Sequence, residues 1–198
     1  MADARAPMSL AARLRSETRA DHRRVERRLL TGGWLDDPVR YRMLVGRLYQ
    51  LHVHLEQAVE RFRDAFIGLD LDSRARSRLL LADLASLGSE MGERGDEASL
   101  EFASPASVLG ALYVVEGSTL GGQVIAEQLR RRLGVDASNG AAGFDPYGAE
   151  TVARWAQFTG YLGSWVENPD DVVTGARDLF EYYEAFVLKA PVAAVSLP

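Results

Sequence analysis

The sequence lacks cysteine altogether, which excludes disulfides, thiolate-bound metal centres and a thiol nucleophile. It has no apolar run of the roughly 18–20 residues that cross a bilayer, and no basic, apolar leader opens it. We therefore expect a cytoplasmic protein without a membrane partner. Long alternating runs of Val and Ile are also missing, which disfavours a β-sheet and leaves an all-α protein as the expectation.

Lysine is scarce, and the excess of positive over negative charge is confined to one end of the chain. The net charge is −5 and lysine occurs once, at Lys189, so nucleic acid is not expected as a partner. Residues 1–30 nevertheless carry eight arginines and four acidic residues, a local net charge of +4 against −9 for the rest. With 198 residues, 47% of them hydrophobic, the chain has the size and composition of one folded domain. We expect that domain over 10–190, between tails at 1–9 and 191–198.

Apolar residues recur at intervals of three and four along nearly the whole chain, the pattern of amphipathic helices. Glycine, proline and capping residues mark where these helices begin and end. The predicted helices cover residues 10–30, 36–66, 72–87, 104–133, 149–167 and 170–188. No repeat or linker divides them, so the expected fold is a single-domain, all-α multi-helical bundle.

The most unusual segment is EGSTLGGQ at residues 116–123, which places three glycines inside otherwise strong helical sequence. Each interior glycine costs about 1 kcal/mol relative to alanine, so the helix must gain something from them. Gly117 and Gly121 are four residues apart and share a face that carries no side chains. Such a face can pack closely against another helix, or it can receive a flat ligand against the backbone.

A polar cluster lies on the predicted first helix at offsets of three, four and seven residues, so its members share one face. They are Arg15, Thr18, Arg19, His22 and Glu26. A neutral histidine binds metals best when its second ring nitrogen is hydrogen-bonded, and Glu26 is placed to do this for His22. The arginines can receive anionic groups of the same ligand. The alternative is a solvated basic helix with an exposed histidine.

Two further histidines, His52 and His54, lie two residues apart on the predicted second helix and so point to different sides of it. No Glu-x-x-His pair is present, so the chain does not have the ligands of a di-iron carboxylate bundle. We interpret both histidines as structural or surface residues.

Two segments carry a resemblance to a known family: LRSETRADH over residues 14–22 and LYVVEGSTLGGQ over residues 112–123. They resemble the two heme-contacting helices of the heme oxygenase family, especially its soluble bacterial members. The stretch FDPYG at 144–148, with Trp155 and Phe158 after it, and LFE at 179–181 extend the resemblance to about residues 10–188. It implies heme held between the first, proximal helix and a glycine-kinked distal helix.

On the proximal side the resemblance implies that His22 is the axial ligand of heme iron. Glu26 would then be hydrogen-bonded to the other ring nitrogen of His22. Candidates for contact with the heme propionates are Arg15, Arg19 and Tyr113, and Phe180 is a candidate for the pocket wall.

On the distal side the resemblance implies that Gly117, Gly121 and Gly122 lie over the opposite heme face. No side chain would bind the iron there, which leaves the sixth coordination position open for dioxygen. Ser118 stands where many family members have aspartate, and its hydroxyl can still hold water near the oxygen ligand.

The activity that the resemblance implies is oxidative cleavage of heme to biliverdin, carbon monoxide and ferrous iron. Heme would be both substrate and cofactor, and O2 a co-substrate. Electrons would come from a ferredoxin or a flavoprotein reductase, or from ascorbate in vitro, and a biliverdin-binding phytochrome is a further candidate partner. Two alternatives stay open: a heme carrier or gas sensor on the same scaffold, and a helical interaction module that has lost heme.

Overall fold

The computed structural model describes residues 8–89 and 100–190, and every regular element within them is helical. The α-helices are α1 (Leu10–Glu17), α2 (Arg19–Thr31), α3 (Pro38–Arg61), α4 (Ser77–Ser86), α5 (Pro105–Leu133), α6 (Thr151–Ser164) and α7 (Pro169–Tyr182). Short 3-10 turns η1 (Arg63–Phe66), η2 (Asp72–Arg74), η3 (Ala142–Phe144) and η4 (Gly148–Glu150) join them, and a π-turn, η5 (Tyr183–Val187), follows α7. The predicted all-α architecture is confirmed. The tails predicted at 1–9 and 191–198 lie almost entirely outside the described residues, and the domain limits stay a prediction.

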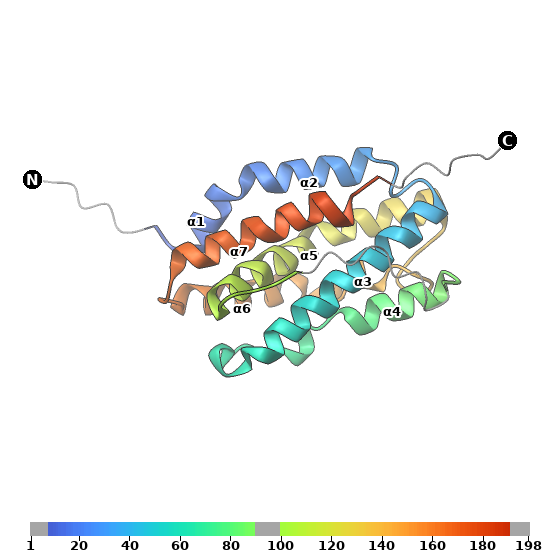
Figure 1. Ribbon diagram of the computed structural model, residues 1–198. Helices are drawn as coiled ribbons and strands as arrows, with labels where there is room; N and C mark the ends of the chain where they lie inside the picture. Colours follow the sequence, from blue (N-terminus) through green and yellow to red (C-terminus); the bar gives the residue numbers. More distant parts are fainter. Residues whose placement is uncertain (1–7, 90–99, 191–198) are drawn as a thin grey trace, which may run out of the picture.

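The centre of the bundle is the packing of α5 on α7, which lie side by side in Figure 1. Gly110 on α5 and Gly175 on α7 allow this approach, because an added Cβ at either would overlap backbone of the other helix. Of the described helices, α5 alone has the length and hydropathy of a possible membrane span, but 56% of that apolar window is buried inside the protein. Its apolar sequence is therefore explained by its place in the core.

The predicted first helix is wrong in one respect, since the chain forms two helices that meet at Thr18. This buried residue leaves helical geometry at φ −103° and ψ 4°, and its hydroxyl donates to the carbonyl of Leu14 at 2.8 Å. A threonine that bonds back to a carbonyl four residues earlier is a common cause of helix bending. Arg15 and His22 therefore belong to different helices, and the face predicted for the cluster holds only within α2.

α2 lies at the edge of the bundle, alongside α7 (Figure 1). None of its residues is fully buried. Polar contacts hold it to the segment after α7: Arg24 donates to Glu184 of η5 at 2.9 Å, and Arg28 donates to the carbonyl of Leu188, just after η5, at 3.1 Å. One side of α2 thus remains free to line a cavity.

Candidate active site

A pocket of about 470 Å³ lies between α2 and the glycine segment of α5. Most of its lining is aliphatic or aromatic, from α3, η3 and the end of α7 as well as from α2 and α5. The polar lining residues are His22, Glu26, His52, Arg76, Ser118 and Tyr183. An apolar cleft of this volume with a few convergent polar groups is typical of a small-molecule site.

His22 stands on the α2 side of the pocket with 61% of its side chain exposed. Its Nδ1 lies 3.9 Å from Oε2 of Glu26, so the predicted hydrogen bond is not formed at this distance. The imidazole instead meets the ring of Phe180 edge-on, with 6.1 Å between the ring centroids. Phe180 also lines the pocket. An accessible imidazole with a carboxylate one turn away can bind a metal that enters the pocket.

The glycines of α5 have three different surroundings, although α5 continues as a helix through all of them. An added Cβ at Gly121 would meet no other described atom within 4 Å, so this position opens into the pocket. Gly117 also lines the pocket, but its Cβ would lie 3.5 Å from the ring of Trp155. A Cβ at Gly122 would overlap the carbonyl oxygen of Phe144.

Gly122 is therefore explained by packing rather than by the pocket. It is buried against η3 and does not belong to the pocket lining of the described chain. The prediction that it lies over the heme face is corrected accordingly. Gly117 and Gly121 line the pocket, and their contact with heme stays a prediction.

The residues predicted for the propionates, Arg15, Arg19 and Tyr113, lie outside the lining of the pocket as described. The two arginines are exposed, on α1 and at the start of α2. Tyr113 is half-buried against Trp155, with 5.6 Å between ring centroids. Burial raises the pKa of Tyr113, and the nearby charge of Arg15 partly offsets this. Contact of these residues with heme stays a prediction.

Three polar residues of the pocket were not predicted from the sequence to line it: His52, Arg76 and Tyr183. His52, interpreted from the sequence as structural or surface, is 5% exposed and lines the pocket. Burial, helped by the charge of Arg76, lowers its pKa well below the usual value, so His52 is neutral at pH 7. Its spacing from Leu44 and Leu48, four residues each time, was a signal that it shares their buried face.

Arg76 is the second missed residue, and no local sequence pattern indicated it. It directly precedes α4 and is 4% exposed. Its guanidinium donates to the carbonyl of Val115 at 2.5 Å and to the hydroxyl of Ser118 at 3.4 Å. The buried guanidinium of Arg76 is thereby held beside the hydroxyl of Ser118, the residue after Gly117.

Part of the pocket wall is formed by η3, which α4 holds in place. Asp83 accepts hydrogen bonds from the backbone N–H groups of Ala142 at 2.9 Å and Gly143 at 2.8 Å. Burial raises the pKa of Asp83, while these two hydrogen bonds oppose the rise. Gly143 and Phe144 line the pocket, so this buried carboxyl fixes part of the pocket's shape.

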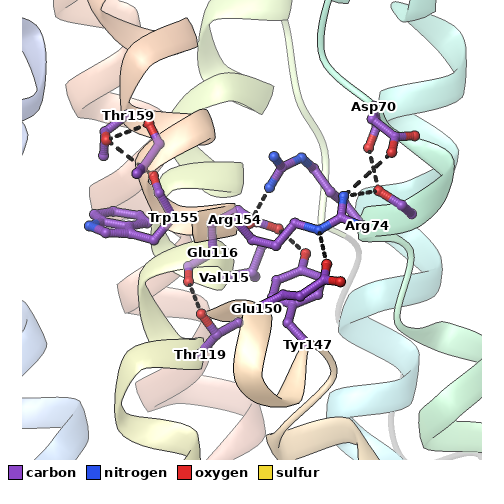
Figure 2. Close-up of polar contacts among 12 residues, drawn as sticks. Asp70, Arg74, Val115, Glu116, Thr119, Tyr147, Glu150, Arg154, Trp155 and Thr159 are labelled. Atoms are coloured by element: carbon purple, nitrogen blue, oxygen red, sulfur yellow. Dashed lines mark hydrogen bonds and ion pairs between the residues drawn. The ribbon is translucent and has the colours of Figure 1, made fainter. Parts of the chain in front are cut away.

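Behind the glycine segment lies a buried ion pair. Glu116 accepts from Arg74 at 2.5 Å and from the phenol of Tyr147 at 2.8 Å (Figure 2). Burial, together with the charge of Glu116, raises the pKa of Tyr147 to about 12. The phenol therefore stays protonated and serves as a donor.

Comparison with protein families gives a match to the heme oxygenase family over residues 8–189. The chain belongs to the heme oxygenase family. A curated heme oxygenase of Xanthomonas campestris pv. campestris (strain 8004) is 28% identical over 146 residues, which cover 72% of this chain and 86% of that protein.

Solved heme oxygenases share the fold. The NO- and CO-bound enzyme of Neisseria meningitidis superposes with a TM-score of 0.80 at 22% identity, over 92% of this chain and 91% of that one. Heme oxygenase-1 of the cyanobacterium Synechocystis sp. PCC6803, solved in complex with heme, gives a TM-score of 0.72 at 18% identity over 89% of each chain.

The protein is thus an all-α enzyme of the heme oxygenase type, whose family activity converts heme to biliverdin. The alternative of a heme carrier or gas sensor is not favoured by these comparisons. The resemblance found in the sequence is confirmed at the level of family, fold and activity.

Proposed function

We propose that heme, as substrate and cofactor, lies in the pocket between α2 and α5, with His22 as the axial ligand of its iron. The observation that carries this proposal is the pairing of two features across one cavity. An accessible imidazole stands on one side, and the open position at Gly121 faces the cavity from the other. The imidazole can bind the metal of a planar ligand from one side. The other face of that ligand then stays uncovered beside Gly121.

The residues of the pocket fit heme in other respects. Leu120 and Val124 are 46% and 62% exposed although they line the pocket, so a bound apolar ring would cover them. The aliphatic walls exclude water from such a ring. The buried guanidinium of Arg76 lines the pocket and adds one positive charge to these apolar walls.

The chain's own residues then have distinct tasks. Bound heme supplies the iron that reacts with O2, our proposed co-substrate, and the ring that is opened. Glu26 orients His22 once the 3.9 Å gap between them closes, and the bare backbone at Gly121 leaves room above the ring. Ser118 donates its hydroxyl to the carbonyl of Val115 at 2.7 Å and accepts from Arg76 at 3.4 Å, so the remaining lone pair of its Oγ can hold an ordered water.

Titration with hemin, followed by turnover, tests the proposal. We expect a Soret band that saturates at one heme per chain. Ascorbate in air, or a ferredoxin system, should then replace that band with the broad red absorption of a bile pigment. Absence of a Soret band would overturn heme binding. A Soret band that persists under reductant and air would indicate a heme-binding protein without turnover.

Electrons must come from outside the chain, and we propose an acidic redox protein such as a ferredoxin as donor. Arg19, Arg23 and Arg27 form an exposed stripe at four-residue intervals along α2, and Arg15 is exposed on α1 before the bend at Thr18. Among residues 8–89 and 100–190 their side chains have no hydrogen-bond or ion-pair partner. The stripe lies on α2, the helix that bears His22, so an acidic donor that binds it would dock close to the iron. We place the reaction in the cytoplasm, with a biliverdin-binding phytochrome as a candidate acceptor of the product.

Reversing the charge of Arg23 and Arg27 together, as R23E/R27E, tests the docking surface. The ferredoxin concentration for half-maximal turnover should rise by about tenfold at low salt and less at high salt, because screening weakens surface charge interactions. Turnover with ascorbate should not change. The matched control is R78E/R131E, which alters two exposed arginines on other helices. Equal effects of both double variants would contradict a specific surface on α2.

A further inference from the structure

The buried ion pair behind the glycine segment has no part in the function proposed above. Glu116 is next to Gly117 in the chain, and its side chain is 1% exposed. The side chains of Arg74 and Arg76 near it are 3% and 5% exposed. Two cations and one anion therefore share a dry region, where solvent screens their charges poorly.

The contacts of Glu116 are unequal toward the two arginines. Its Oε2 accepts from Arg74 at 2.5 Å and its Oε1 accepts from Tyr147 at 2.8 Å (Figure 2). The guanidinium of Arg76 is 4.0 Å from Oε1 and donates to a backbone carbonyl instead. Glu116 thus pairs directly with one arginine and leaves the other without a hydrogen-bonded carboxylate.

Other titratable groups nearby do not compensate Arg76. His52 is neutral at pH 7, since burial and the charge of Arg76 lower its pKa. Glu56 accepts from backbone N–H groups at the start of α4, and Asp83 accepts from those of η3. Neither carboxylate forms an ion pair with an arginine within the described part of the chain. Arg76 itself lines the pocket and reaches the hydroxyl of Ser118.

We propose that Glu116 is a positioning residue that sets the electrostatic potential of the pocket beside Ser118, by neutralising Arg74 and leaving Arg76 positive. The inference rests on heme lying in this pocket. A positive potential on this side of the ring favours an anionic over a neutral ligand at the iron. Glu116 acts by its charge and without touching the ligand, because it does not itself line the pocket.

Two single variants should shift this potential in opposite directions. Glu116→Gln keeps the shape but removes the negative charge, so the acid–alkaline transition of the ferric heme complex should move to lower pH. Arg74→Met frees Glu116 to compensate Arg76, so the same transition should move to higher pH. Each shift should be roughly one pH unit, the order expected for one buried charge. In the ferrous CO complex the C–O stretch should fall in Glu116→Gln and rise in Arg74→Met.

The controls separate charge from structure. Tyr147→Phe removes a hydrogen bond to Glu116 without changing charge, and should leave the transition near its wild-type pH. The double variant R74M/E116Q removes both charges and should do the same. If Glu116→Gln does not fold, Arg74→Met compared with R74M/E116Q measures the same charge difference.

Shifts of both single variants in one direction, or no shift in either, would overturn the inference. Heme binding by the wild-type protein is seen first, as a Soret band. Failure of the proposed function would therefore be recognised before the titration begins.

Discussion

Replacing His22 with alanine is expected to remove the axial ligand and nearly all turnover. Among the described residues that line the pocket, His22 is the accessible histidine, since His52 is 5% exposed. We expect hemin still to enter the apolar pocket, with a Soret band that is shifted and broadened. Biliverdin formation should fall by roughly 100-fold or more, because the ligand sets both the place and the electronic state of the iron.

External imidazole is the control for the His22→Ala variant. If the loss comes from missing ligation, millimolar imidazole should restore much of the Soret band's position and part of the turnover. A variant with wild-type spectrum and rate would assign the axial role to another group. The variant's stability should be near that of the wild type, because the imidazole of His22 makes an edge contact with Phe180 and no side-chain hydrogen bond within the described chain.

The adjacent glycines 121 and 122 should respond in opposite ways to the same substitution. Gly121→Ala adds a methyl group to open space in a helix, so it should stabilise the protein by about 0.5–1 kcal/mol. Gly122→Ala drives its methyl group into the carbonyl of Phe144, which is backbone and cannot rotate away. We expect a loss of about 2–3 kcal/mol in the free energy of unfolding.

Urea unfolding of the heme-free variants measures both changes, and each variant is the matched control of the other. Since Gly122→Ala displaces η3, which forms the pocket wall, it should also weaken hemin binding. Gly121→Ala should bind hemin but turn over more slowly, because its methyl group occupies space on the open side of the pocket. Equal stability of the two variants would contradict the close contact between Gly122 and Phe144.

The bend at Thr18 could not be predicted from the spacing of residues along the chain. The apolar spacing of residues 10–30 fits one continuous helix, and local propensity does not distinguish that helix from two. The hydroxyl of Thr18 bonds to the carbonyl of Leu14 inside the protein, and this buried contact accompanies the change in direction. Arg15 consequently lies on a different helix from His22.

The helical fold and the family followed from the amino-acid order, and the family resemblance predicted that His22 and Gly121 face the same ligand. Helical periodicity and glycine spacing are local properties, so they can be recognised in the sequence without knowledge of the tertiary contacts. The roles of Gly122, His52, Arg76 and Glu116 were decided by tertiary structure alone. A glycine that avoids a clash and a glycine that opens a cavity look the same in sequence. An arginine becomes a pocket residue only when α4 brings it against α5, 42 positions away from Ser118.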